Sequence, residues 1–373
     1  MNEDKLKTFG GCIQRVINKE QLSREETRSL FREILENKQP DLQQGAFLAA
    51  LVSKGETAQE IAGAWEAINT YDTLPVTVRN CGLLVENSGT GMDSLKTFNV
   101  SSAAGIVAAA CGATLARHGA RALTSFCGTV DILERVGIDV ECDVQTVARS
   151  IESVGIGLFN GMSPQVHPAA LGRILSQIRF GSTLNIAASL ANPARPGAGL
   201  RGVYAEALIP LVAQVMREIG YQKGMVVHGR DDHSDGGMDE MSVTGETIIR
   251  NFAGEQMADL RMRPEDVGLP TAHFEEIAAT NDFQKESRRF IQVLAGQGHE
   301  ACVNFTCLNA GAILVVAGVV KNLRDGITMS REAILSGTAV RKLRDWIAVQ
   351  NRDPESGLEK MSRVLRLAEV NIN

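Results

Sequence analysis

The chain has 373 residues, of which 44% are hydrophobic, 22% charged and 5% aromatic. The composition is that of a globular protein, because a disordered chain would carry fewer aliphatic side chains and a collagen would repeat glycine. The formal net charge of −6 provides no large positive field for phosphate polymers, which argues against nucleic-acid binding as the main role. The length suggests two domains, or one large α/β unit with an appendage.

Cysteine and histidine spacing argues against a zinc site. The seven cysteines form no CxxC pair and the six histidines form no HExxH cluster, a pattern typical of reduced thiols. The N-terminus is polar and lacks the apolar core of a signal peptide. The longest apolar runs, 103–110 and 310–320, are shorter than the roughly 20 residues of a membrane span. We therefore expect a cytoplasmic protein without a membrane segment.

The first 70 or so residues are expected to be helical. Ser23 with Glu26, and Thr57 with Glu60, form capping boxes ahead of apolar positions at helical spacing. The segment 45–51 between them is small and apolar on all sides, as in a buried helix–helix contact. The sequence predicts a compact helical unit.

From about residue 80, short apolar runs bounded by glycine alternate with amphipathic stretches. This alternation indicates βαβ units and a mostly parallel sheet. The expected strands are 83–86, 114–117, 200–203 and 224–228, and the expected helices are 101–111, 130–136, 168–179 and 205–219. The predicted fold is a small helical unit followed by a larger α/β domain.

A glycine-rich turn follows the first expected strand and leads into a helix. Gly89 and Gly91 would let the backbone approach an anion closely, with Asp93 at the end of the turn. Asn99 and Ser101 stand where the helix begins, so free N–H groups and the positive end of the helix dipole would face a phosphate. Taken alone, the segment is equally well explained as a tight turn with a serine cap.

Cationic and hydroxyl side chains follow the next strand. Arg117, His118 and Arg121 stand at its carboxyl end, a place that suits a phosphorylated ligand in an open α/β crevice. The run 124–129 then offers hydroxyl groups ahead of a helix. Ordinary surface arginines and a partly buried histidine are the alternative reading.

The third segment is acidic. Asp239 and Glu240 follow a glycine pair and an apolar strand, and adjacent carboxylates of this kind suit Mg²⁺ bound together with substrate phosphates. A solvated acidic loop, with further aspartates at 231, 232 and 235, is the alternative. Together the three segments point to an enzyme that handles a phosphate- or pyrophosphate-bearing small molecule.

In this order and spacing, the segments resemble the anthranilate phosphoribosyltransferase family. That family carries GTGGD, a TFNIST-like run, KHGNR, a serine-rich loop, RTLFN with LGPLxNP, and GGMDE. The matching segments here are 89–93, 97–102, 117–121, 124–131, 183–193 and 236–240, with further matches at 44–51, 54–57 and 308–312. The resemblance covers nearly the whole chain, and GGMDE with TFNxSSA is specific.

The resemblance implies a fold of the nucleoside phosphorylase/phosphoribosyltransferase type. Residues 1–76 would form the helical domain, with helices from about 165–185 packed on it, and residues 77–373 the α/β domain. It also implies a homodimer through the helical part, and Mg²⁺-dependent transfer of a 5-phosphoribosyl group from phosphoribosyl pyrophosphate (PRPP) to an aromatic amine. By position, the PRPP contacts would be Gly89, Gly91, Asp93, Asn99, Ser101, Ser102, Arg117 and Thr129, and the metal ligands Ser101, Asp239 and Glu240.

Several positions in the pyrophosphate loop and the acceptor site depart from the family pattern. Met92 replaces the second glycine of GTGGD, Ala120 the asparagine of KHGNR, and Gly181 the arginine of RTLFN. The family uses that asparagine and arginine on anthranilate, so the resemblance places His118, Ala120 and Gly181 at the acceptor. Arg179, two residues before Gly181, is a candidate replacement, although a shift of two residues rotates the side chain.

The remaining departures are Arg117, in place of the lysine of KHGNR, Phe126, in place of the lysine of the serine-rich loop, and Ala188 and Ser189, in place of Gly-Pro. With Met92, Phe126 favours a more apolar acceptor pocket or an altered phosphate loop. The acceptor is therefore expected to be anthranilate or a related aromatic nitrogen compound. Two alternatives stay open: a nucleoside phosphorylase of the same architecture, and a non-catalytic homologue that binds nucleic acid or another ligand.

Overall fold

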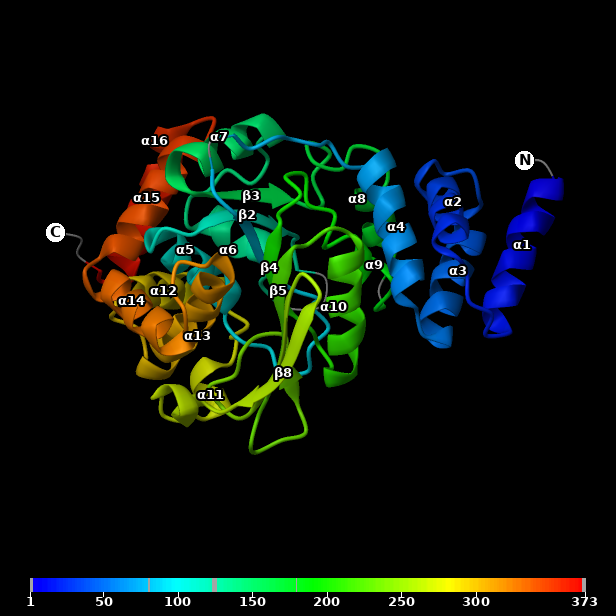
Figure 1. Ribbon diagram of the computed structural model, residues 1–373. Helices are drawn as coiled ribbons and strands as arrows, with labels where there is room; N and C mark the ends of the chain where they lie inside the picture. The colour runs from blue at the N-terminus through cyan, green and yellow to red at the C-terminus, as the bar shows by residue number, and fades with distance from the viewer. Residues whose placement is uncertain (1–2, 80, 123–125, 179, 371–373) are drawn as a thin grey trace.

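The computed structural model describes residues 3–79, 81–122, 126–178 and 180–370. One twisted sheet forms the centre of the molecule, helices cover both of its faces, and the N-terminal helices stand at one side (Figure 1). The strands are β1 Leu84–Gly89, β2 Thr114–Gly119, β3 Ile156–Asn160, β4 Ala198–Gly202, β5 Lys223–Arg230, β6 Gly237–Met238, β7 Thr247–Ala253 and β8 Gln256–Met262.

The strand order creates a crevice at the middle of the sheet. Along the main path the order is β3-β2-β1-β4-β5-β7-β8, with β6 paired to β5. The first five of these strands are parallel, whereas β6, β7 and β8 are antiparallel additions. From β1 the chain proceeds outward to β2 and β3, then returns to β4 on the other side of β1. The connections after β1 and β4 diverge, and ligands bind in such crevices at the carboxyl ends of parallel strands.

Sixteen α-helices are present in the part of the chain that the structure describes. The N-terminal helices are α1 Glu3–Ile17, α2 Arg24–Leu35, α3 Asp41–Lys54 and α4 Ala58–Tyr71. The others are α5 Val100–Ala110, α6 Thr129–Arg135, α7 Val144–Val154, α8 Leu171–Gln177, α9 Leu184–Ala187, α10 Ile209–Glu218, α11 Phe274–Ile277, α12 Phe283–Leu294, α13 Glu300–Ala317, α14 Leu323–Leu335, α15 Thr338–Gln350 and α16 Pro354–Leu367.

The helical unit forms as the sequence predicts and docks through α4. Both expected capping boxes are present, Ser23 with Glu26 on α2 and Thr57 with Glu60 on α4. Apolar side chains of α1–α4 share one buried cluster with those of α8, α9 and α10. Trp65 on α4 reaches across this contact and donates its Nε1–H to the carbonyl of Leu190 (2.9 Å). The domain boundary near residue 76 falls in the extended segment after α4, and we retain it as a proposal.

The expected strands and helices of the α/β domain are present, with shifted ends. The strand expected at 83–86 continues to Gly89, and the helix expected at 205–219 is a 3₁₀ turn, Glu206–Leu208, followed by α10. The expected helix 168–179 is α8, and its last expected position, Arg179, lies outside the described residues. The sequence did not reveal β3, β6, β7 or β8. The outer strand β8 is almost wholly exposed, so it lacks the apolar pattern that marks a strand.

One described helix is long and apolar enough to cross a membrane by length and composition, namely α13 with 18 residues. In this fold 83% of that stretch is buried. It packs against α5 and α14 and on the sheet, within the largest apolar cluster. Its apolar character is therefore explained by its position as a central core helix.

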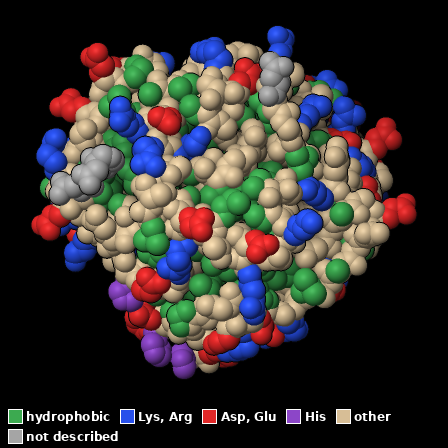
Figure 2. Space-filling model, turned by 60° about the vertical axis from the view of Figure 1, so that its left-hand side comes forward, with side chains coloured by type: hydrophobic (Ala, Val, Ile, Leu, Met, Phe, Trp, Pro, Cys, Tyr) green, Lys and Arg blue, Asp and Glu red, His purple; other side chains and the backbone are tan. Residues whose placement is uncertain are grey.

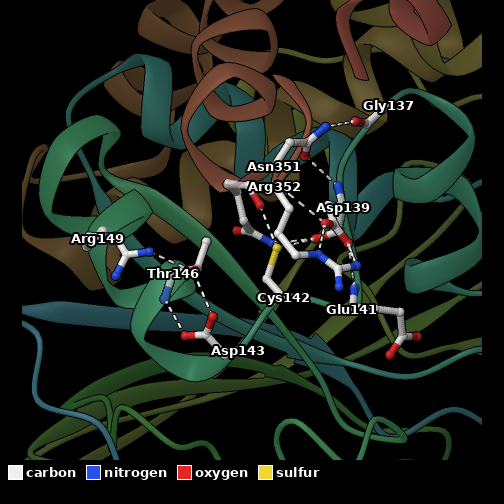
Figure 3. Close-up of polar contacts among 10 residues, drawn as sticks. Gly137, Asp139, Glu141, Cys142, Asp143, Thr146, Arg149, Asn351 and Arg352 are labelled. Carbon is white, nitrogen blue, oxygen red and sulfur yellow. Dashed lines mark hydrogen bonds and ion pairs between the residues drawn. The ribbon is translucent and has the colours of Figure 1, made fainter. Parts of the chain in front are cut away.

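The edge strand β3 is held by the C-terminal helices. Gln350, at the end of α15, accepts hydrogen bonds from Leu158 N (3.0 Å) and Trp346 Nε1 (2.7 Å), and its Nε2 donates to Leu158 O (3.2 Å). Beside it, Arg352 pairs with Asp139 and Asn351 donates to the carbonyl of Gly137, so the loop between α6 and α7 is fixed to the end of α15 (Figure 3). The side chain of Gln350 thus satisfies backbone groups that a further strand would otherwise pair.

We predict that Gln350→Leu lowers the free energy of unfolding by about 2–4 kcal/mol, because a buried amide N–H, a carbonyl and an indole N–H lose their partner. Urea denaturation measures the loss. Arg344→Leu, at an exposed position on the same helix, should change the midpoint little. Equal midpoints for the Gln350 variant and the wild type would contradict the assigned role.

Candidate active site

A cleft of about 290 Å³ opens at the carboxyl ends of β1 and β2. It brings together the three segments that the sequence singles out. Of the site residues expected from the sequence, those that line it are Gly89, Gly91, Asp93, Asn99, Ser101, Ser102, Arg117, His118, Ala120, Thr129, Asp239 and Glu240. Gly181 stands beside the lining residues Phe180 and Ser182, while Arg179, Thr124 and Ser125 lie outside the described residues.

Asp239 occupies the crevice between β1 and β4, and only glycine leaves room for it. A Cβ atom at Gly89 would collide with its carboxylate, and one at Gly202 would collide with its backbone carbonyl. Its carboxylate accepts a hydrogen bond from the backbone N–H of Gly91 (2.6 Å). The glycine turn and the acidic segment therefore fit together as one structure.

Three carboxylates gather at this end of the cleft. Asp93, Asp239 and Glu240 each present an oxygen within 4.8 Å of the other two. Burial, and then repulsion from Asp239, raises the pKa of Asp93 to about 6, and burial likewise raises the pKa of Asp239 and Glu240. Lys96, the cation that pairs with this group, contacts Asp93 (2.6 Å). Glu240 Oε2 is buried and has no hydrogen-bond partner among the described residues. Carboxylate oxygens with so few neighbouring cations and hydrogen-bond donors are suited to bind a hard divalent cation such as Mg²⁺.

The first turn of α5 faces the cleft without a side-chain cap. Asn99 stands at the N-cap, but its amide donates to the carbonyl of Cys127 (3.3 Å) instead of capping the helix. Ser101 and Ser102 follow in the first turn and line the cleft. Exposed N–H groups at a helix N-terminus form a favourable place for a phosphate.

Arg117 is a buried cation under this turn. Its Nε donates to Asn87 Oδ1 (3.0 Å) and its NH1 to Ser102 Oγ (3.1 Å), while Asn87 Nδ2 donates to the carbonyl of Ser101 (2.7 Å). Burial lowers the pKa of Arg117 to about 10, so the group stays charged at neutral pH. Arg117 and Asn87 together fix the serines of the α5 turn.

Arg121 does not provide a free cation, which favours the alternative reading of an ordinary arginine. It pairs with Glu134 (2.8 Å) and Asp131 (3.2 Å), and lies 3.7 Å from Glu141. Asp131 in turn accepts from the backbone N–H groups of Ala122 and Gly128. The role of Arg121 is to hold the loop after β2 to α6.

The opposite end of the cleft is apolar and contains a histidine pair. Its walls include Met92, Phe180, Leu175 of α8 and Ile178 directly after α8. Met92 has a positive φ of 70°, a strained conformation for a side chain of its kind. A Cβ atom at Gly181 would lie 3.4 Å from Met92 Cε. Met92 thus packs over the glycine, and the two departures from the family pattern are spatially complementary.

His118 and His167 are buried against each other. Their Nε2 atoms are 3.1 Å apart, Nδ1 of His118 faces the carbonyl of Ser189 (3.2 Å), and Nδ1 of His167 faces the carbonyl of Asp72 (3.1 Å). Burial lowers the pKa of His118 to about 3 and that of His167 to about 4. Both rings are therefore neutral at physiological pH.

Sequence reasoning missed some residues of the cleft. Lys96, Phe180 and Asn185 line it, and Arg201 lies directly behind the lining residue Ser189. Lys96 stands three residues after Asp93, so its place near the cleft could have been predicted from the sequence. Arg201 gave a different signal, namely a charged residue inside the short apolar and glycine run of a buried strand.

Comparison with known proteins agrees with this geometry. The α/β domain model of a glycosyl transferase family matches residues 82–340, and the helical bundle domain model of the same family matches residues 11–70. An anthranilate phosphoribosyltransferase from Methanothermobacter marburgensis is 33% identical over 91% of this chain and 97% of its own. One from Anaeromyxobacter sp. strain K is 37% identical over 90% of this chain and 97% of its own.

Solved structures show the same fold. The crystal structure of anthranilate phosphoribosyltransferase from Thermus thermophilus superimposes with a TM-score of 0.81 at 28% identity, covering 91% of this chain and 98% of that one. The Saccharomyces cerevisiae enzyme in complex with PRPP and Mg has a TM-score of 0.78 at 21% identity, covering 96% and 98%. The fold and the cleft are those of a phosphoribosyltransferase, an enzyme of the glycosyl transferase class. Within that class, the chain belongs to the anthranilate phosphoribosyltransferase family.

The lowered pKa values of the histidine pair predict an acid-sensitive fold. Each ring is neutral when folded but takes up a proton near pH 6.5 when unfolded, so its contribution to stability is present above about pH 6.5 and is lost as the pH falls toward 4. In His167→Gln, the drop in the free energy of unfolding between pH 7 and pH 5 should be smaller by about 1–2 kcal/mol. Urea titrations at several pH values measure it. His233→Gln, at an exposed position, should retain the wild-type drop, and an unchanged drop in the His167 variant would contradict the prediction.

Proposed function

We propose that the protein transfers the 5-phosphoribosyl group of PRPP, in a Mg²⁺-dependent reaction, to the nitrogen of anthranilate or a related aromatic amine, releasing pyrophosphate. The observation that carries the proposal is the single cleft in which the carboxylates of Asp93, Asp239 and Glu240 face the uncapped N-terminus of α5. The carboxylates suit a metal and the nearby turn of α5 suits a phosphate, and a phosphorylated sugar pyrophosphate needs both.

Each predicted PRPP contact has a place in this arrangement. Asp93, Asp239 and Glu240, with Ser101 nearby, would hold Mg²⁺ against the pyrophosphate, close to the turn of Gly89 and Gly91. The first turn of α5, with Asn99, Ser101 and Ser102, and Thr129 on the opposite wall would hold phosphate or ribose oxygens. Arg117 contributes its charge from beneath Ser102.

The chemistry requires positioning more than a nucleophilic side chain. Loss of pyrophosphate leaves positive charge on the ribose and negative charge on the leaving group; bound Mg²⁺ supplies charge stabilisation to that leaving group. The backbone N–H groups of the glycine turn and of α5 stand ready to hold the phosphates without reorganisation. An aromatic amine held in line with the anomeric carbon attacks with its own lone pair, and such positioning contributes several kcal/mol.

The acceptor half of the cleft supports a flat aromatic ligand. Met92, Phe180 and Leu175 supply apolar walls, and His118 forms part of the boundary. Because His118 is neutral and both of its ring nitrogens have partners, it orients the acceptor and does not serve as a general base. A weakly basic aryl amine loses its proton easily once the new bond forms, so a strong base is unnecessary.

The proposal includes a cytoplasmic location and small-molecule ligands. All seven cysteines are unpaired, which supports a cytoplasmic location. On the face in Figure 2, Lys and Arg side chains are interspersed with Asp and Glu and form no continuous basic band. That pattern supports small-molecule ligands over nucleic acid.

Binding and activity measurements test the function directly. Titration calorimetry should show PRPP binding that Mg²⁺ strengthens at least about tenfold, and Glu240→Gln should lower kcat/KM by about 10²–10³ because a ligand of the metal is lost. Asp239→Asn should act similarly, and Asp235→Asn, at an exposed position in the same segment, should match the wild type. Absence of PRPP binding in the presence of Mg²⁺ would contradict the proposal.

We further propose a homodimer formed through the helical unit. On α3, the apolar side chains Leu42, Ala46, Ala49 and Val52 form an exposed stripe, and Leu42 is 88% exposed. A large aliphatic side chain so exposed at helical spacing suits burial against a second subunit. Light scattering should give a dimer for the wild type and a monomer for Leu42→Glu. A monomeric wild type would contradict the proposal.

A further inference from the structure

A second hollow lies where α12 contacts both α6 and α16, and we call it the basic groove. Its volume is about 500 Å³, within the roughly 300–1,000 Å³ of small-molecule pockets. Four of its nine lining residues are cations, namely Arg135 of α6, Arg288 of α12, and Lys360 and Arg363 of α16. Among the described residues it shares no lining residue with the active-site cleft.

The four cations of the basic groove are uncompensated. In the part of the chain that the structure describes, none of them has an ion pair or a hydrogen bond. Exposed arginines elsewhere do have partners. Arg261 lies 3.0 Å from Glu206, and Arg352 lies 2.7 Å from Asp139. Four cations that converge on one hollow without acids therefore distinguish this groove from the ordinary charged surface of the protein.

The acids beside the groove are already engaged. Glu134, the carboxylate among the lining residues, pairs with Arg121 (2.8 Å). Asp282, the N-cap of α12, accepts hydrogen bonds from the backbone N–H groups of Gln284 (2.8 Å) and Lys285 (3.1 Å). The groove thus presents positive charge within a chain whose net charge is −6. So small a positive region favours a small anion over a nucleic acid, which neutralises many phosphates along its length.

Two arginines of the groove have N–H groups available for a ligand. The guanidinium carbon of Arg135 lies 4.0 Å from the centroid of the Phe283 ring, and that ring lies 4.3 Å from the ring of Phe126. Contact with the ring face holds the guanidinium in place and leaves its N–H groups free. The Nε of Arg288 is buried and has no hydrogen-bond partner among the described residues. A buried N–H without a partner is costly, and an anion bound by this guanidinium would offset that cost.

The rest of the groove suits a small organic scaffold. Val364 and Leu367 of α16 supply apolar surface, and Leu367 is 38% exposed. The side-chain amide of Gln284 has no partner in the described part of the chain, so it can donate to a ligand. Ser287 already donates its hydroxyl to the carbonyl of Phe283 (2.7 Å). Recognition therefore depends on guanidinium and ammonium groups, which favour phosphate.

We propose that the basic groove binds a small organic anion with two or more phosphate groups, at a site separate from the active site. A phosphate monoester carries a charge of about −1.5 to −2 near pH 7, so four unpaired cations match two such groups. Arg135 and Arg288 bind one phosphate through paired N–H donors, and Lys360 and Arg363 on α16 bind the other. The site does not depend on phosphoribosyl transfer.

Titration calorimetry with fructose 1,6-bisphosphate tests the proposal, because this probe carries two phosphates on a short scaffold. The protein is titrated free and also saturated with PRPP and Mg²⁺. In the saturated state one bisphosphate should bind per chain with a Kd below about 1 mM, and fructose should not bind. Binding to the free protein alone would assign the probe to the active site and overturn the proposal. The PRPP titration by itself tests the proposed function, so the two failures are distinguishable.

Two pairs of substitutions locate the site. Arg288→Gln with Arg363→Gln removes two of the four cations and should weaken bisphosphate binding at least tenfold. Lys321→Gln with Arg344→Gln removes the same charge at exposed positions that do not line the groove, and should leave the affinity within about twofold. Lys360→Gln with Arg363→Gln, both at exposed positions, replaces the first pair if the Arg288 change destabilises the fold. Equal weakening in the groove pair and the control pair would show a general effect of net charge and overturn the proposal.

An acidic protein partner is the competing occupant of the groove. A hexaglutamate peptide should bind at least tenfold more weakly than the bisphosphate, because a flexible chain loses conformational entropy when it is ordered. Tighter binding of the peptide, weakened by the same groove substitutions, would make the groove a protein-docking surface and contradict the assignment to a small phosphorylated anion.

Discussion

The active-site cleft depends on the close fit of Asp239 between Gly89 and Gly202. Neither glycine can carry a side chain without a collision, and the parallel strands β1 and β4 meet the acidic segment only because both are glycine. The bond from Gly91 to the Asp239 carboxylate then connects the two loops that diverge from the crevice. Strand order places the crevice, and the two glycines let the carboxylate enter it.

From this fit follows a cleft with two electrostatic ends. The carboxylates of Asp93, Asp239 and Glu240 collect where backbone turns meet, whereas the guanidinium groups of Arg117 on β2 and Arg201 on β4 are buried below, on the two strands that flank β1. The carboxylate cluster alone is unfavourable because like charges are held together, and each buried arginine alone is unfavourable because its charge is removed from solvent. A phosphorylated ligand that brings a divalent cation with it would offset both costs.

The fold could be predicted from sequence to the extent that local patterns determine it. Capping boxes located α2 and α4, and apolar runs bounded by glycine located β1, β2, β4 and β5. The strands β6 and β8 were missed because one has only two residues and the other is exposed. Most of the cleft was visible as motifs, but the pairing of Arg121 with acids, and the contact of Met92 with Gly181, are tertiary and leave no trace in residue spacing.

The linker after α4 ties the acceptor wall to the helical unit. Asp72 accepts hydrogen bonds from the backbone N–H groups of residues 169, 170 and 171, so it fastens the start of α8, and Leu175 and Ile178 of that region form part of the cleft. The phosphate-binding turns belong instead to the sheet. Any rotation of the helical unit would therefore move the acceptor wall of the cleft, whereas the phosphate-binding turns would stay with the sheet. Such a hinge would admit the flat acceptor sideways without disturbing a sugar pyrophosphate already in place.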